Sequence, residues 1–233
     1  MTPANCREAI KQLPIFLASS EVTREYLLNN TIIRTCKKKN YLFELRDPVD
    51  SVYLLLDGFV VLDRESDSHG IKSIFLLGKG DLLNEVILDS NTASVTCRAL
   101  SDCTVLCIPK TVLLHLMEQD WQLNQYILHS MTKKIRKLYR LLESTTRTTT
   151  LRHQIASRIW KFANDHGEQT ENFLVIPFDM RITLIADFVG SNRETVSRII
   201  KEMNELHILS LKNGTCMIYD MDKLLEYKDH KLF

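Results

Sequence analysis

Several kinds of enzyme chemistry have no signature in this sequence of 233 residues. It contains no glycine-rich phosphate-binding loop, no histidine pair with metal-ligand spacing beside an acid, and no convincing nucleophile and base. We therefore expect no enzymatic activity and no bound metal. No run of 18 apolar residues occurs, so we expect no membrane span. The first residues also lack the pattern of a signal peptide, which favours a cytoplasmic protein.

The sequence has six cysteines but no C-x-x-C pair. Cysteines scattered in this way are typical of reduced, buried thiols in a cytosolic protein. An iron–sulfur cluster needs about four thiolates close together, and only Cys6 and Cys36 precede the core of the β-rich region described below. Cys103 and Cys107 are spaced to share one face of a strand, which suits packing. A redox switch made from two thiols, or haem ligation by one of the seven histidines, is left as an alternative, and no cofactor is identified.

An excess of charge is also missing, because the formal net charge is +1. The region after Thr145 holds 12 Lys and Arg against 12 Asp and Glu. If this chain binds nucleic acid, local placement of charge must therefore do the work. Hydrophobic residues at 45% and charged residues at 25% are ordinary globular values, and the length allows two domains.

Residues 30–108 have the composition of β-structure. Short runs rich in Val, Ile, Leu and aromatics are separated by turn residues such as Asp57-Gly58 and Gly78-Lys-Gly80. The predicted strands are Tyr41–Leu45, Val52–Leu56, Phe59–Leu62, Ile71–Leu77 and Ser94–Ile108. Many short strands at this spacing indicate a roll or a sandwich.

A helical pattern follows, and Pro109 is placed to open it as a first-turn residue. Apolar residues then alternate at spacings of three and four, which is a heptad pattern. Its members are Leu114, Met117, Trp121, Asn124, Leu128, Met131, Ile135, Leu138 and Leu142. From Trp121 to Leu142 we expect this stripe to be the interface of a parallel homodimer, with Asn124 as the polar residue that fixes register. Asp120 marks a break between two helices, and a core-facing helix of a monomer is the alternative.

The positive charges beside this stripe are interpreted as a solvated face. They are Lys133, Lys134, Arg136, Lys137 and Arg140.

The remaining sequence predicts a separate small domain. The segment 144–150 is rich in threonine and poor in helix formers, which indicates a hinge. Leu151–His166 is amphipathic and ends before Gly167, and Phe173–Phe178 is a short strand. Asn213-Gly214 lies between two apolar runs, which is a strong hairpin signal.

Residues 182–200 have the layout of two short helices joined by a tight turn. Ala186 is small where the helices must cross, Gly190 lies at the turn, and Val196 is an apolar plug on the second helix. Polar residues, including Arg193, Glu194 and Arg198, point outward at the start of that helix. Arg can pair with guanine and Glu can accept from cytosine, so this is the pattern of a DNA-recognition helix. A purely structural helical hairpin is the alternative.

Taken together, these features resemble the Crp/Fnr (cyclic AMP receptor and fumarate-nitrate regulator) superfamily of bacterial transcription regulators. The most specific part is Gly190-Ser-Asn-Arg-Glu-Thr-Val-Ser-Arg198. The resemblance implies that DNA is contacted by Asn192, Arg193, Glu194, Thr195, Ser197 and Arg198. Arg193, Glu194 and Arg198 would read bases, and Ser197 stands where anaerobic regulators carry a base-contacting serine. Either Ser191, in a capping box that occupies Glu194, or Asn192 would cap the helix.

The resemblance also implies an α+β fold with three parts. These are a β-roll of the cyclic-nucleotide-binding type at 1–120, a dimerisation helix at 121–145, and a winged helix-turn-helix at 146–233. The implied partners are double-stranded DNA with a palindromic operator, a second copy of the chain, an unidentified small-molecule effector and, as a candidate, RNA polymerase. An effector module that acts on a protein partner is the alternative.

The sensor half departs from the family's phosphate-binding pattern. Alignment through Arg98-Ala99 puts Ala93 at the position of the family's phosphate-clamping arginine, and Asn84 replaces a glycine. A buried phosphate would then lack a charged partner, which is costly. We therefore expect an effector other than cyclic AMP. The candidate pocket residues are Asn84, Glu85, Ser94, Arg98 and Asn124.

Overall fold

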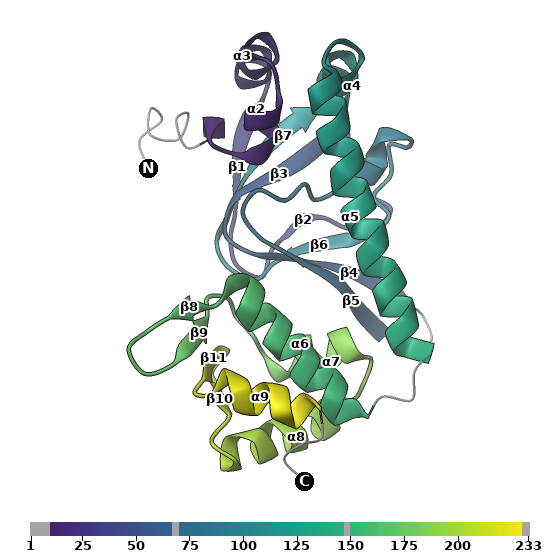
Figure 1. The fold of residues 1–233 in the computed structure, drawn as a ribbon. Helices are drawn as coiled ribbons and strands as arrows, with labels where there is room; N and C mark the ends of the chain where they lie inside the picture. The colour runs from purple at the N-terminus through teal and green to yellow at the C-terminus, as the bar shows by residue number, and fades with distance from the viewer. Residues whose placement is uncertain (1–9, 67–69, 147–149, 230–233) are drawn as a thin grey trace. The chain divides into compact units, whose positions relative to one another are not determined.

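The computed structural model describes residues 10–66, 70–146 and 150–229 (Figure 1). The fold is α+β, as the sequence predicts. The chain divides into two compact units, one of residues 1–64 and 75–143, the other of residues 65–74 and 144–233.

The first unit is built on two antiparallel sheets (Figure 1). One has the order β1-β7-β3 and the other the order β2-β6-β4-β5. The strands are β1 Ile32–Cys36, β2 Tyr41–Phe43, β3 Ser51–Asp57, β4 Val60–Ser66, β5 Gly70–Leu77, β6 Thr96–Ala99 and β7 Cys103–Pro109. The β-rich region is therefore confirmed, but the single strand expected at Ser94–Ile108 is wrong. It is two strands, because β6 and β7 belong to different sheets and the chain must turn between them at residues 100–102.

The core of this unit joins the inward faces of both sheets. Cys97 from one sheet, Val105 and Leu106 from the other, and Leu123 and Ile127 from the long helix all lie in the same buried cluster. Two short helices that the sequence did not predict, α2 Pro14–Ala18 and α3 Glu21–Asn29, also contribute to it. A short 3-10 turn, η1 Glu85–Leu88, follows β5. The five described cysteines are all buried and free of disulfides.

The helix pair after the sheets is broken at Asp120, as expected. Helix α4 is Lys110–Gln119 and helix α5 is Trp121–Thr146. Pro109, however, is the last residue of β7 and the N-cap of α4, so the prediction that it lies within the first turn is wrong. Its fixed φ suits the extended end of the strand as well as a helix start.

Asp120 holds the break in place through both oxygens of its carboxylate. Oδ1 accepts hydrogen bonds from the backbone N–H groups of Gln122 at 3.0 Å and Leu123 at 3.1 Å, which caps α5. Oδ2 accepts from the N–H of Ser20 at 2.8 Å, and Ser20 is itself the N-cap of α3. One buried carboxylate therefore fixes the starts of two helices.

Helix α5 has two apolar faces. Leu123 and Ile127 are fully buried against the sheets, whereas the stripe that carries the heptad pattern is largely exposed in the protomer. The exposed fractions along it are Trp121 65%, Leu128 50%, Ile135 45%, Leu138 39% and Leu142 64%.

In the second unit, the first helix is α6 Leu151–His166, whose predicted bounds are confirmed. It continues through β8 Glu168–Gln169, β9 Leu174–Ile176, α7 Ile182–Val189, α8 Arg193–Glu205, β10 Leu209–Lys212, β11 Thr215–Ile218 and α9 Met221–Lys228. The strands form one sheet in the order β10-β11-β9-β8. Phe162 of α6 packs edge-on against Phe178 and Phe188, with ring centroids 5.8 and 5.1 Å apart, so aromatic contacts join α6 to α7.

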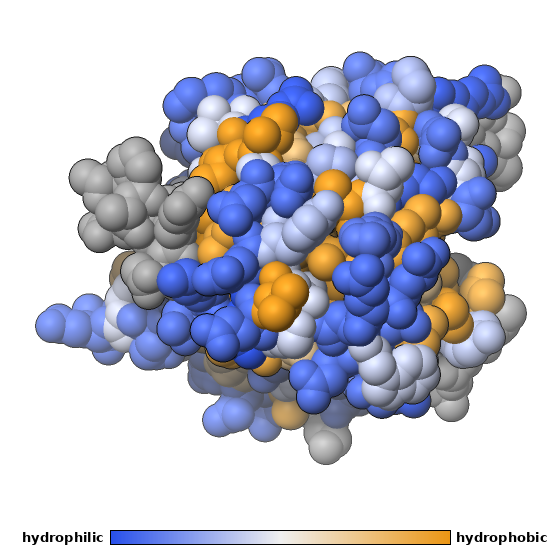
Figure 2. Space-filling model, turned by 90° about the horizontal axis from the view of Figure 1, so that it is seen from above, coloured by the Kyte–Doolittle hydropathy of each residue, from blue (hydrophilic) through white to orange (hydrophobic). Residues whose placement is uncertain are grey.

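The end of the molecule at which α3 and α4 lie shows apolar side chains in separate patches between hydrophilic ones (Figure 2). Exposed apolar residues of α2 and α3 include Leu17, Val22 and Tyr26. Within the described ranges, no helix is both long enough and apolar enough to cross a bilayer.

The capping carboxylate generates a pH-dependent stability prediction. Burial raises the pKa of Asp120, but hydrogen bonds from Ser20, Thr23 and Leu123 outweigh burial and lower it from 3.8 to about 2. A pKa that is lower in the folded state stabilises the fold above pH 3.8, and this contribution is lost as the pH falls to about 2. Asp120→Asn should therefore lower the free energy of unfolding by about 1–2 kcal/mol at neutral pH.

The difference between wild type and Asp120→Asn should shrink toward zero across that acid range. Urea denaturation followed by circular dichroism at a series of pH values measures it. Asp89→Asn, at an exposed aspartate, is the matched control and should change little at any pH. A difference between Asp120→Asn and wild type that stays constant down to pH 2 would contradict the assignment.

Candidate functional site

The segment from α7 to α8 is the helix-turn-helix that the sequence predicts. Gly190 ends α7 with φ 68° and ψ 44°, a left-handed conformation that costs glycine little. Its N–H and that of Ser191 donate to the carbonyl of Ala186 at 2.8 and 3.1 Å, which closes the turn. Ala186 and Val196 are buried where the two helices meet.

Asn192 caps the second helix and resolves the capping question. Its side-chain oxygen accepts from the N–H of Thr195 at 2.8 Å, and its backbone is extended, as an N-cap requires. Ser191 lies outside the helix, so the capping box with Glu194 does not form. The carboxylate of Glu194 is exposed at the start of α8.

The six residues expected to contact DNA lie together at the first two turns of α8. Asn192, Arg193, Glu194 and Arg198 are exposed, and Thr195 and Ser197 are half-buried. Val196, Ile199 and Ile200 turn the opposite face of the helix into the core. The arrangement presents two guanidinium groups and one carboxylate on a single exposed face, with the hydrogen-bonding groups that base edges require.

A two-residue hairpin lies beyond the helix, as Asn213-Gly214 predicts. Lys212 pairs with Thr215, and both turn residues have positive φ, 51° and 84°. Gly214 also has no room for a side chain, because a Cβ there would lie 1.7 Å from Oδ1 of Asp179. Its carbonyl accepts from the N–H of Met180 at 2.8 Å, which ties the hairpin to the segment before α7. The helix-turn-helix therefore carries a β-wing.

Comparison with known families agrees with both units. Residues 33–120 match the cyclic nucleotide-binding domain, and residues 153–227 match the Crp-like helix-turn-helix domain. The chain belongs to the Crp/Fnr family of transcription regulators.

Relatives of known function are similar to this regulator over most of their length. The HTH-type transcriptional regulator ArcR of Staphylococcus haemolyticus is 26% identical over 209 residues, which cover 89% of this chain and 90% of that protein. The cAMP-activated global transcriptional regulator CRP of Pasteurella multocida is 26% identical over 214 residues, 86% of this chain and 96% of that protein. These relatives are transcription regulators and not enzymes, in agreement with the sequence.

Solved structures share the fold. The structure of FixK2 from Bradyrhizobium japonicum has a TM-score of 0.72 at 16% identity, and the match covers 84% of this chain and 96% of that chain. A Crp/Fnr family transcriptional regulator from Thermus thermophilus has a TM-score of 0.67 at 19% identity, over 85% and 98% of the two chains.

The sensor residues Asn84 and Ala93 are engaged with the backbone of the roll. The Asn84 side chain accepts from the N–H of Tyr53 at 2.8 Å and donates to the carbonyl of Ser51 at 3.0 Å. Ala93 is buried, and its N–H donates to the carbonyl of Asp47 at 2.9 Å. Asn84 therefore holds η1 against strand β3, and the methyl group of Ala93 offers a ligand no charge.

Glu85 is buried and its partners come from α5. Its carboxylate accepts from the hydroxyl of Ser130 at 2.8 Å and forms an ion pair with Lys134. The Lys134 ammonium also donates to the carbonyl of Leu82 at 2.8 Å, and only 16% of its side chain is exposed. The interpretation of Lys134 as part of a solvated face is therefore wrong.

A signal for Lys134 was present in the sequence. Leu123, Ile127, Ser130 and Lys134 follow one another at spacings of four, three and four, so they share a second face of α5. This second face of α5 packs on the roll, whereas the heptad stripe lies on another face of the same helix.

The other sensor candidates do not gather around Glu85. Arg98 is bound to Asp63 of the neighbouring strand, with nitrogen–oxygen distances of 2.8 and 3.0 Å. Ser94 is exposed, and Asn124 is half-buried in the first turns of α5. No cluster of three or more metal-binding side chains occurs in the part of the chain that the structure describes.

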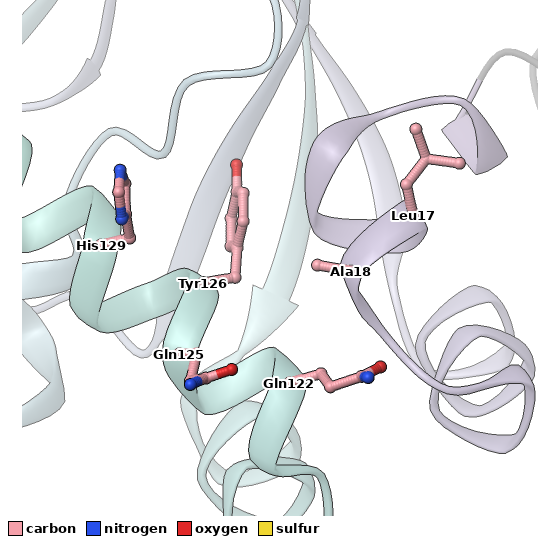
Figure 3. Close-up of a pocket in the computed structure, with 6 residues that line it drawn as sticks. All are labelled: Leu17, Ala18, Gln122, Gln125, Tyr126 and His129. Atoms are coloured by element: carbon pink, nitrogen blue, oxygen red, sulfur yellow. The ribbon is translucent and has the colours of Figure 1, made fainter.

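An open groove of about 430 Å³ lies between α2 and α5 (Figure 3). Gln122, Gln125, Tyr126 and His129 line it from α5, and Leu17 and Ala18 from α2. Tyr126 donates to the carbonyl of Gly80 at 3.3 Å. Burial, together with the nearby Asp81 and Glu85, raises the pKa of Tyr126 to about 12, so the phenol is neutral. Among the residues that the structure describes, the groove is lined by amides, a phenol and an imidazole, and by no lysine or arginine that could bind a phosphate.

Proposed function

We propose that the regulator binds a palindromic operator as a homodimer and responds to an effector other than cyclic AMP. The observation that carries sequence-specific binding is the exposed start of α8. Asn192 caps this helix, so Arg193, Glu194 and Arg198 are all left free to meet base edges. In the major groove the two arginines favour guanine and Glu194 favours cytosine.

The exposed stripe of α5 supports a dimer. Five large apolar side chains spaced along one helix face are costly to leave in water, and the spacing suits a parallel two-stranded coiled coil. A two-fold dimer presents two recognition helices to successive major grooves about 34 Å apart, and its operator must then be palindromic. A signal in the roll would act by changing the population of dimers with that spacing.

The chemistry of the sensor unit argues against a cyclic nucleotide. The position of the family's arginine is a buried alanine, and the arginine nearest in sequence is paired with Asp63. Lys134 is a partly buried cation, but Glu85 already neutralises it. A phosphate in this interior would have to displace a carboxylate from its ion pair, which is unfavourable. The groove beside α5, whose described lining includes two glutamines and a tyrosine, is instead suited to a polar ligand without a phosphate.

Selection of bound duplexes from a random pool tests the DNA assignment. We expect a palindrome with half-sites that resemble TGTGA, or TTGAT if Ser197 makes the family's serine contact. Arg198→Ala should cost roughly 1–3 kcal/mol of binding free energy and relax preference at one base pair in each half-site. Lys201→Ala, at an exposed lysine farther along α8, is the control and should leave preference unchanged. A selected motif without guanine, or an Arg198→Ala loss equal on all sequences, would contradict base reading by these residues.

The exposed stripe of α5 gives a prediction about the dimer. Ile135→Asp should dissociate the dimer, because a carboxylate buried in an apolar seam would have no partner. Lys133→Asp, two residues away and off the stripe, changes the charge by a larger amount and should leave the dimer intact. Light scattering measures both. A dimer that survives Ile135→Asp would show that the two copies meet elsewhere.

Calorimetry with cyclic AMP and cyclic GMP tests the sensor assignment. We expect no binding at micromolar concentrations, because loss of a buried charge-assisted contact weakens affinity on the order of a thousandfold. Arg98→Ala and Lys134→Met, measured in parallel, identify the source of any binding that occurs. Micromolar affinity that either variant abolishes would mean that the arginine or lysine supplies the missing charge, and the proposal would be wrong.

A further inference from the structure

Helices α6, α8 and α9 of the second unit are joined at one point by a side-chain cluster. The Arg152 guanidinium of α6 donates hydrogen bonds to the Glu202 carboxylate of α8. Its Nε lies 3.1 Å from both oxygens, and its Nη2 lies 2.9 Å from Oε2. The hydroxyl of Tyr227 in α9 donates to Oε1 of the same carboxylate at 3.0 Å. We call Arg152, Glu202 and Tyr227 the α6–α8 clamp.

The clamp lies at the ends of its helices. Arg152 is the second residue of α6, whereas Glu202 and Tyr227 are in the last turns of α8 and α9. A second contact reinforces it, because Nδ1 of His153 lies 2.7 Å from the carbonyl of Lys228, and a carbonyl can only accept. The start of α6, which follows the 144–150 segment in the chain, is thus bound directly to the far end of the recognition helix.

We propose that Arg152 and Glu202 are positioning residues for base recognition, since they fix the tilt of α8. This inference rests on the base reading by α8 proposed above. Glu202 lies nine residues beyond Arg193, or about 13 Å along the helix axis. A tilt of about 5° at one end therefore moves the other end by roughly 1 Å. Hydrogen bonds to base edges tolerate only a few tenths of an ångström, so a shift of that size breaks them.

Because the clamp is partly exposed, its role in orienting α8 can be distinguished from a contribution to the stability of the domain. Half of the Arg152 side chain and 27% of the Glu202 side chain are exposed, and ion pairs so exposed contribute little to the free energy of unfolding. The bidentate geometry and the fully buried Tyr227 nevertheless set the direction of the contact. Loss of the clamp should therefore leave the domain folded and alter how α8 meets DNA.

Binding to two duplexes tests the proposal with the full-length protein. One duplex carries the sequence selected by the wild type, and the other carries the same bases scrambled. Arg152→Met should weaken binding to the selected duplex about tenfold and leave binding to the scrambled one within about twofold. The slope of log affinity against log salt should not change, because no phosphate contact is lost.

Coupling between the partners provides the second part of the test. Glu202→Gln should reduce discrimination in the same direction, and the Arg152→Met/Glu202→Gln double variant should be no worse than Arg152→Met alone. Tyr227→Phe should give a smaller loss of the same kind. Lys161→Met is the control, because it removes the same charge from α6 and breaks only an ion pair with Asp165 within that helix. It should not change discrimination.

Four results would overturn the inference. An equal loss on both duplexes with a salt slope smaller by about one would make Arg152 a phosphate contact. Wild-type discrimination in folded Arg152→Met, or additive effects in the double variant, would mean that the clamp does not position α8. If the wild type itself fails to discriminate between the duplexes, base reading by α8 fails first, and that outcome is distinct from the other three.

Discussion

Helix α5 has two apolar faces, one buried against the sheets of the roll and one exposed, and the rest of the regulator depends on this helix. Leu123 and Ile127 seal the core of the roll, and the buried Glu85–Lys134 ion pair with Ser130 continues that contact farther along the helix. The heptad stripe lies on another face of the same helix and is largely exposed. In the dimer that we propose, this helix would carry both the contact with the roll and the contact with the second copy. Such an arrangement would allow a change in the roll near Glu85 to bias the dimer.

The DNA-binding unit depends on backbone constraints at its turns. Gly190 adopts a conformation that other residues rarely tolerate, and Gly214 sits where a side chain would collide with Asp179. Asn192 is the N-cap of α8, so Glu194 is not needed for a capping box and stays exposed. These positions are small or polar for conformational reasons. They allow the region after Thr145, which has equal numbers of acidic and basic residues, to present two arginines on one face. Local placement replaces net charge as the source of DNA affinity.

Charge in the sensor unit is balanced inside the protein. Arg98 is paired with Asp63, and Lys134 with Glu85, so both of these partly buried cations already have a carboxylate partner. The family fold is kept, and these pairings support our proposal that the effector is not a cyclic nucleotide. In the α6–α8 clamp of the second unit, Arg152 and Glu202 likewise neutralise each other. In our proposal this pair orients α8 rather than binding a ligand.

Local pattern was enough for the features that depend on neighbouring residues in the chain. The helix-turn-helix, the Asn213-Gly214 wing, the break at Asp120 and the bounds of α6 follow from turn residues, caps and periodicity, and the family follows from the motif in α8. Contacts between distant segments were not accessible in this way. The division of Ser94–Ile108 between two sheets, the bonds of Asn84 to β3, and the partnership of Lys134 with Glu85 each join residues that the sequence keeps apart. The spacing of Leu123, Ile127, Ser130 and Lys134 indicates a second face of α5. It does not identify Glu85 as the partner of Lys134, because only the packing of α5 on the roll brings these two residues together.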